Sequence, residues 1–83
     1  MRIPLHRLLF PDNMPAGLDW AVIGLWVCFF RKTAKRCDPP ILVKAEGFYW
    51  RIEDGRHRVI GAMIAGRQHI DADVIKQEGD ANA

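Results

Sequence analysis

The chain has 83 residues, a formal net charge of +2 and 49% hydrophobic residues. This length leaves room for one domain, and the mixture of apolar and charged residues favours a globular fold over a disordered segment. Two cysteines are too few for a disulfide-rich secreted scaffold, and no secretory signal is recognisable, so we expect a cytoplasmic protein. The small net charge neither requires nor excludes nucleic acid as a partner.

The first part of the chain predicts a strand, a loop and a helix. Residues 3–8 alternate loosely and contain Pro4, which lacks an amide hydrogen and therefore suits an edge strand. Residues 10–17 are rich in proline, glycine and small polar residues, which predicts a loop. A helix follows, with Asp19 as its N-cap and the basic residues 31–36 at its negative end.

The segment from Trp20 to Phe30 is apolar around its whole circumference. Its eleven residues are too few to span a bilayer, which takes about 20, so we expect a buried helix with Cys28 inside. A small sheet covers only one side of such a helix, and exposed apolar patches usually mark interfaces. We therefore predict an interface with a second copy or a host protein, formed by Trp20, Ile23, Trp26, Val27 and Phe30.

The rest of the chain predicts a hairpin, a helix and a last strand. The expected elements are a strand at 41–45, a turn at Glu46-Gly47, a strand at 48–52, a helix at 56–65 and a strand at 69–75. Gly66 fits the left-handed position after the helix. The inner stripe of the helix is expected to be Val59, Ile60, Met63 and Ile64. The last strand should turn Ile70, Ala72 and Val74 inward.

This order predicts an α+β domain with a small mixed sheet of about four strands and two main helices. The domain is expected to cover residues 1–76, with a polar tail at 77–83. Its predicted core includes Trp50, Ile52, Ile60, Ile64 and Val74.

The turn from Asp54 to Arg58 is the clearest candidate site. The first amides of a helix lack intrahelical partners and the helix dipole is positive there, so an anion gains hydrogen bonds and a favourable field. We expect Asp54 to cap the turn and Gly55 to admit a phosphate. Arg58 and His57 are expected to bind the phosphate, and Arg56 to close over it. An ordinary N-cap followed by exposed charges stays open as the alternative.

The residues from Pro40 to Ile75 combine an apolar strand, a short hairpin, a strand ending in Asp-Gly, a charged motif that opens a helix, an Ala-Gly and a final strand. This stretch resembles the ParB/sulfiredoxin-like domain, in which those elements follow in the same order. The resemblance implies that family's fold, with a phosphate or nucleotide pocket at the charged motif. Short stand-alone members of the family resemble products of phages and other mobile elements.

Three branches of the family carry different motifs at this turn. Sulfiredoxins carry Gly-Cys-His-Arg, which Gly55, His57 and Arg58 match, but Arg56 stands where the attacking cysteine would be. ParB proteins carry Gly-Glu-Arg-Arg in a CTP pocket, and the same Arg56 replaces the glutamate. Free-serine kinases carry Asp-Gly-His-His-Arg, of which four residues match. Because Arg56 occupies the variable position, we expect it to contribute less to anion binding than Gly55 and Arg58.

The favoured function is a module that binds a phosphate or nucleotide without strong catalysis. The residues do not identify a cofactor, although a nucleoside triphosphate with Mg²⁺ is compatible with the turn. One alternative is a phage or mobile-element protein that acts through helix 20–30 on a host protein or DNA complex. A lesser alternative is a kinase-like or nuclease enzyme, whose carboxylate base would be Asp12 or Asp19. No catalytic residue is assigned, and no metal site is expected because the histidines form no spaced ligand motif.

Overall fold

The computed structural model describes residues 1–10, 17–32 and 40–75. Its elements are β1 (Arg2–Pro4), the 3-10 turn η1 (Leu5–Arg7), β2 (Leu8–Leu9), α1 (Trp20–Lys32), β3 (Ile41–Glu46), β4 (Tyr49–Asp54), α2 (Arg56–Ile64) and β5 (His69–Val74). The α+β class is confirmed, with five strands in place of about four. Most of the predicted loop, the basic residues 33–36 and the tail at 77–83 lie outside the described residues.

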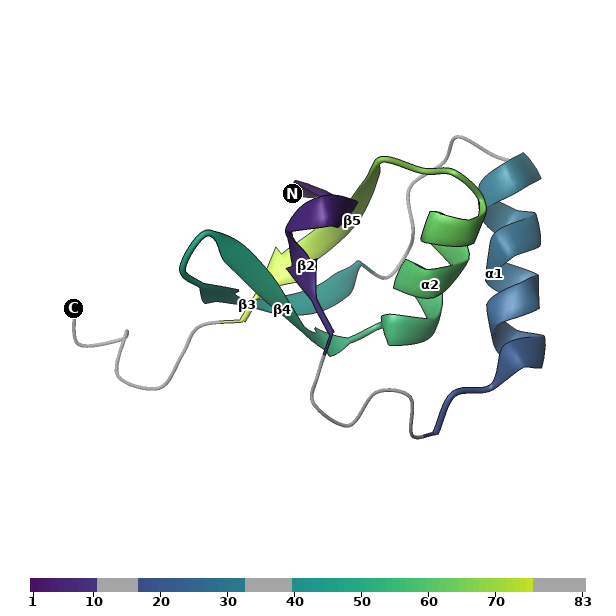
Figure 1. Ribbon diagram of the computed structural model, residues 1–83, viewed down its shortest axis with the longest axis horizontal. Coiled ribbons are helices and arrows are strands. Elements are labelled where there is room, and N and C mark those ends of the chain that lie inside the picture. The colour runs from purple at the N-terminus through teal and green to yellow at the C-terminus, as the bar shows by residue number, and fades with distance from the viewer. Residues whose placement is uncertain (11–16, 33–39, 76–83) are drawn as a thin grey trace.

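The sheet has the order β1-β5-β3-β4-β2 and is mixed, because β3 pairs parallel with β5 and antiparallel with β4. Its two edge strands are neighbours in sequence, separated only by η1. A 3-10 turn of three residues spans roughly 6 Å, so the sheet must curl until the start of the chain bridges both edges (Figure 1).

The prediction of a single strand at residues 3–8 is therefore wrong. Its backbone breaks at Leu5, whose amide donates to the carbonyl of Gln68 at 2.9 Å beside β5. The chain then turns and pairs again at Leu8, on the opposite edge of the sheet. An alternating pattern does not reveal this change of edge, because β1 and β2 each keep one side chain buried, Ile3 and Leu8.

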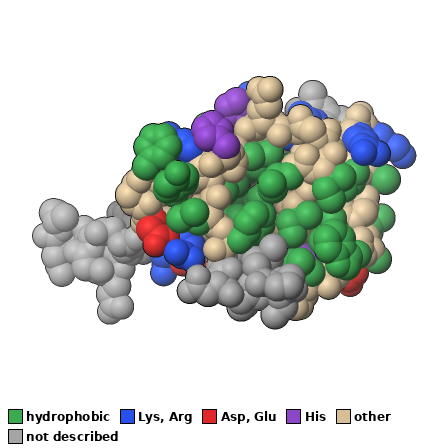
Figure 2. Space-filling model, viewed as in Figure 1, with side chains coloured by type: hydrophobic (Ala, Val, Ile, Leu, Met, Phe, Trp, Pro, Cys, Tyr) green, Lys and Arg blue, Asp and Glu red, His purple; other side chains and the backbone are tan. Residues whose placement is uncertain are grey.

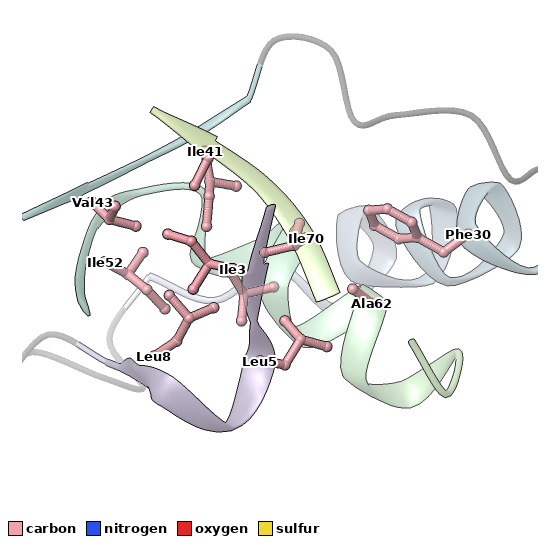
Figure 3. Packing of buried hydrophobic residues seen from close by; sticks show 11 residues of the cluster. Ile3, Leu5, Leu8, Phe30, Ile41, Val43, Ile52, Ala62 and Ile70 are labelled. Atoms are coloured by element: carbon pink, nitrogen blue, oxygen red, sulfur yellow. The ribbon is translucent and has the colours of Figure 1, made fainter. Parts of the chain in front are cut away.

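The core lies inside the curled sheet and under α2. Its buried hydrophobic cluster consists of Ile3, Leu5, Leu8, Phe30, Ile41, Val43, Ile52, Val59, Ala62, Ile70 and Ala72. Figure 3 shows these side chains converging, with Phe30 reaching in from α1 towards Ala62. Ile52 is confirmed as core, whereas Trp50 and Ile60 are only half-buried. The prediction that Ile64 and Val74 belong to the core was wrong, since their side chains are 50% and 44% exposed.

The buried face of α2 also differs from the predicted stripe. The helix buries Arg58, Val59, Gly61 and Ala62 and leaves Met63 exposed. The reason is that α2 lies between the sheet and α1, so it is contacted on two sides (Figure 1). A Cβ on Gly61 would lie 2.6 Å from the Cβ of Trp26. Small residues therefore face inward to allow this close approach, and the larger apolar residues face out.

Replacing Gly61 by alanine is expected to lower the free energy of unfolding by about 1–3 kcal/mol, because the new methyl overpacks the contact between the helices. Gly24→Ala is the matched control, since a Cβ there meets nothing within 4 Å and helix propensity alone favours alanine by about 1 kcal/mol. Thermal unfolding of both variants measures the difference. A Gly61→Ala variant stabilised as much as Gly24→Ala would contradict this packing.

Helix α1 starts as predicted and packs mainly against α2. Oδ1 of Asp19 accepts hydrogen bonds from the amides of Ala21 and Val22 at 3.0 and 3.3 Å, which confirms the N-cap. The expectation of a buried Cys28 is wrong, because that residue lies on the side away from α2 and is exposed. No helix among the described residues is both long and apolar enough to cross a membrane.

The burial of Ile23 and Phe30 corrects the interface predicted from the sequence. These two side chains are 1% and 6% exposed, so they cannot contact a partner without opening the domain. Trp26 and Val27 are half-buried against α2. Of the five predicted residues, only Trp20 is largely exposed, at 65%.

The turns fall close to their predicted positions. Glu46 pairs with Tyr49, so the hairpin turn is Gly47-Phe48, one residue later than expected. After α2, Gly66 adopts φ +84° and its amide donates to the carbonyl of Met63, as predicted for a left-handed C-terminal glycine. This turn directs the chain into β5.

Candidate phosphate-binding site

An open hollow of about 590 Å³ lies beside the start of α2. Its lining residues are Val22, Trp26, Ile52, Glu53, Asp54, Gly55, Arg56, His57 and Arg58. The structure thus brings all five residues of the predicted turn to one cavity. Sequence reasoning did not find that α1 supplies a wall, through Val22 and Trp26, because nothing in the sequence shows which helices will pack together.

The N-cap of α2 is Gly55, not Asp54. Gly55 has φ +113° and makes no side-chain cap hydrogen bond, and its carbonyl accepts the first helical bond from the amide of Val59. The predicted capping role of Asp54 is therefore wrong. Its carboxylate instead accepts from Nη2 of Arg58 at 3.3 Å. No side chain at the cap position competes with an anion for the first amides of α2.

Gly55 also has a different role from the predicted one. A Cβ at this position would lie 2.5 Å from Cγ2 and 2.8 Å from Cβ of Ile41 on β3. The missing side chain would therefore collide with Ile41, and it would also lie 3.2 Å from Nη2 of Arg58. Glycine is required here by the left-handed backbone and by the contact with β3.

Arg58 is a largely buried member of the site. Its side chain is only 10% exposed, and the guanidinium carbon lies 5.9 Å from the ring centroid of Trp26. The ion pair with Asp54 holds its Nη2 at the rim of the hollow. Buried guanidinium groups depend on such partners, since an unpaired buried charge is costly. Arg58 thus joins the start of α2 to α1 as well as lining the cavity.

Arg56 carries the clearest sign of a missing partner. Its Nη1 atom is buried and has no hydrogen-bond partner among the residues that the structure describes. Leaving a buried donor unsatisfied costs about 1–3 kcal/mol, and more for a charged group. Arg56 also lines the hollow, but Nη1 itself is closed off from solvent, so an acceptor in the hollow would reach this atom only after the side chain turns.

His57 links the start of α2 to the start of α1 by a hydrogen bond. Its Nε2 accepts a hydrogen bond from the backbone amide of Asp19 at 3.0 Å. An imidazole nitrogen that accepts carries no proton, so the ring proton lies on Nδ1. His57 is thus committed to positioning α1 against α2, and only its other nitrogen is left to meet a ligand.

The two acids that line the hollow are both paired. Glu53 lies 3.2 Å from Nζ of Lys44, and Asp54 lies 3.3 Å from Arg58. Their charges partly offset the arginines, so the cavity is polar but not strongly basic. Within the described ranges, no group of three or more His, Cys, Asp or Glu residues is placed to hold a metal ion.

No protein-family model matches the chain, and no curated protein matches it either. Solved structures do match. A sulfiredoxin from Arabidopsis thaliana superposes with a TM-score of 0.75 over 93% of this chain and 84% of its own, at 18% identity. The chain has the ParB/sulfiredoxin-like fold. The resemblance seen in residues 40–75 is therefore confirmed at the level of the fold.

Two structures of the chromosome-partitioning protein ParB from Caulobacter crescentus match the same fold. The first, complexed with CTP-γ-S, has a TM-score of 0.73 at 19% identity, and the second, complexed with the centromeric parS site, has 0.72 at 17%. Each match covers 95% of this chain. The chain spans only 45% and 40% of those two ParB chains, and such low identities show the fold alone.

Proposed function

We propose that this ParB/sulfiredoxin-like domain binds the phosphate group of a nucleotide in the hollow at the start of α2. The observation that carries the proposal is that two guanidinium side chains, those of Arg56 and Arg58, line the hollow beside a helix start that has no side-chain cap. A phosphate supplies acceptor oxygens for these donors, and guanidinium groups suit phosphate geometry. The nucleotide part of the proposal is supported by the structural similarity to Caulobacter ParB, which was complexed with CTP-γ-S.

In this arrangement the phosphate lies against the uncapped first turn of α2, where the helix dipole favours an anion. Arg56 donates from one side. Arg58 donates from the rim once its bond to Asp54 is shared with the ligand. The apolar wall of Val22 and Trp26 is left for the less polar part of a nucleotide, since ligand pockets combine apolar walls with a few polar groups.

We propose binding without strong catalysis. Arg56 occupies the position of the attacking cysteine of sulfiredoxins, and an arginine is not a nucleophile. The acids in the hollow are held in ion pairs with Lys44 and Arg58, so neither is an obvious free base. A nucleoside triphosphate with Mg²⁺ remains the ligand form to test first, against pyrophosphate without metal.

Arg56→Ala is expected to weaken the binding of pyrophosphate and nucleoside triphosphates roughly ten- to a hundredfold. A hydrogen bond to a charged group contributes about 1.5–3 kcal/mol, and about 1.4 kcal/mol is tenfold in affinity. We therefore propose a larger role for Arg56 than its variable position in the motifs indicates. Calorimetric titration of each ligand, with and without Mg²⁺, measures the effect.

The matched control is Arg2→Gln, which removes an exposed arginine on β1 outside the residues that line the hollow. It should leave the affinity unchanged. Thermal unfolding of the Arg56→Ala protein should show no loss of stability, because the substitution removes an unsatisfied buried donor. Equal affinity of the wild type and Arg56→Ala, or no binding by the wild type to any phosphate ligand, would overturn the proposal.

A further inference from the structure

A second hollow, of about 540 Å³, lies at the other end of α2 from the candidate phosphate-binding site. It is lined by residues of β1, η1, the end of α2 and the start of β5. These include two of the chain's three histidines, His6 and His69, together with Met63, and they include no acid. Figure 2 shows histidine side chains gathered at the top of the molecule, away from the acidic ones. The hollow thus offers nitrogen and sulfur donors without a carboxylate.

The backbone holds the two histidines at the same place although they are far apart in the sequence. The amide of Leu5 donates to the carbonyl of Gln68 at 2.9 Å. His6 follows the donor residue and His69 follows the acceptor residue, so each histidine is one position from this hydrogen bond. Both side chains are exposed and both line the hollow. The sequence predicted no metal site because it shows no spaced histidine motif, and this pair is formed only by the folding of η1 against β5.

Met63 adds a thioether to the two imidazoles. It lies in the last turn of α2, and its side chain is 50% exposed. The C-terminal end of a helix carries the negative end of the helix dipole, which favours a bound cation. Arg67 is the cationic side chain in the lining. Its Nε and Nη2 atoms both donate to the carbonyl of Phe30, at 3.1 and 2.8 Å, so its guanidinium is directed towards the end of α1.

The donor types select the kind of metal ion. Mg²⁺ and Ca²⁺ prefer oxygen ligands, and no carboxylate lines this hollow. Zinc sites are built from thiolates, imidazoles and carboxylates rather than from thioethers. A thioether is a soft ligand that favours Cu(I), and imidazole also binds copper. Two imidazoles and one thioether therefore fit Cu(I) better than the other common metal ions.

We propose that His6, His69 and Met63 form a three-ligand site for Cu(I) in the hollow at the end of α2. Each imidazole holds the ion through one ring nitrogen, and the thioether sulfur supplies the third donor. All three side chains are exposed, so they can close on the ion by changing rotamers while the backbone stays in place.

Titration with Cu(I) under anaerobic, reducing conditions, in competition with a chromogenic Cu(I) chelator, tests the proposal. The parent protein carries Cys28→Ser and Cys37→Ser, because thiolates also bind Cu(I), and it should bind one equivalent. Met63→Leu, which removes the sulfur but keeps an apolar side chain, should weaken binding at least about tenfold, and so should His69→Ala. Loss of even an outer-shell partner typically costs roughly 10–100-fold in metal affinity.

The matched control is Gln68→Ala, which changes an exposed residue of the same hollow that carries no soft donor. It should bind Cu(I) like the parent. Bound Cu(I) should also raise the melting temperature of the parent by mass action but not that of Met63→Leu. No binding by the parent, or an affinity that Met63→Leu leaves unchanged, would overturn the proposal. Neither result depends on the phosphate site, because the titration contains no phosphate ligand and these residues lie outside the lining of that hollow.

Discussion

Gly55→Ala is expected to lower the melting temperature more than any other alanine substitution considered for this domain. Gly55 has φ +113°, a conformation that side-chain-bearing residues rarely adopt. Holding alanine in a sparsely populated backbone region costs about 1–3 kcal/mol. The new methyl would also lie 2.5 Å from Cγ2 of Ile41, and overpacking adds about 1–3 kcal/mol.

The sum of roughly 2–6 kcal/mol corresponds to a drop of at least about 8 °C, since about 1 kcal/mol shifts the melting temperature of a domain this small by about 4–8 °C. Gly66→Ala separates the two contributions. Gly66 has φ +84° but a Cβ there meets nothing within 4 Å, so only the backbone strain remains. Thermal unfolding should rank wild type, Gly66→Ala and Gly55→Ala in that order. Equal losses at the two glycines would show that the contact with Ile41 relaxes.

The order of elements was predictable because local signals agree along the chain. Asp19 caps α1, and Gly66 ends α2 in the left-handed conformation, as their residue types indicate. The break of the first strand at Leu5 was not predictable, since it depends on pairing with β5 and β4 from the far end of the chain. Sequence pattern does not report which strands become neighbours.

The helix faces were the least predictable feature. A hydrophobic pattern assigns the larger apolar residues of α2, such as Met63 and Ile64, to the inside. The structure buries Gly61 and Ala62 instead, because close packing against α1 selects small residues. The same packing buries Arg58 beside Trp26. A residue chosen as an exposed anion ligand thus also became part of the contact between the helices.

The place of the candidate site was predictable, but the contacts of its residues were not. All five residues from Asp54 to Arg58 line the hollow, because they are consecutive and lie at one junction. Their roles depend on contacts made across the fold. His57 accepts from the amide of Asp19, and Gly55 fits against Ile41. Neither partner is adjacent in sequence. The residue types alone therefore predicted contacts with a ligand, whereas in the structure His57 contacts Asp19 and Gly55 fits against Ile41.

Substitutions at the two ends of the Arg58–Asp54 ion pair are expected to change phosphate affinity in opposite directions. Arg58→Ala removes a donor at the rim of the hollow, so binding should weaken roughly ten- to a hundredfold. Unlike Arg56→Ala, it should also lower the free energy of unfolding, because the side chain is only 10% exposed and packs beside Trp26. Loss of such buried contacts leaves a cavity.

Asp54→Asn should instead strengthen binding about fivefold. The Asp54 carboxylate is 69% exposed, so its repulsion of a nearby phosphate is largely that of charges in water, about 1 kcal/mol at close range. Neutralising it removes that repulsion and weakens its competition with the ligand for Nη2 of Arg58. Because exposed charges are screened, the gain should shrink as salt is added. Calorimetric titration of pyrophosphate at low and high salt measures both variants. Weaker binding by Asp54→Asn would mean that this carboxylate helps to hold the ligand, for example through Mg²⁺, and would contradict the charge balance argued for the hollow.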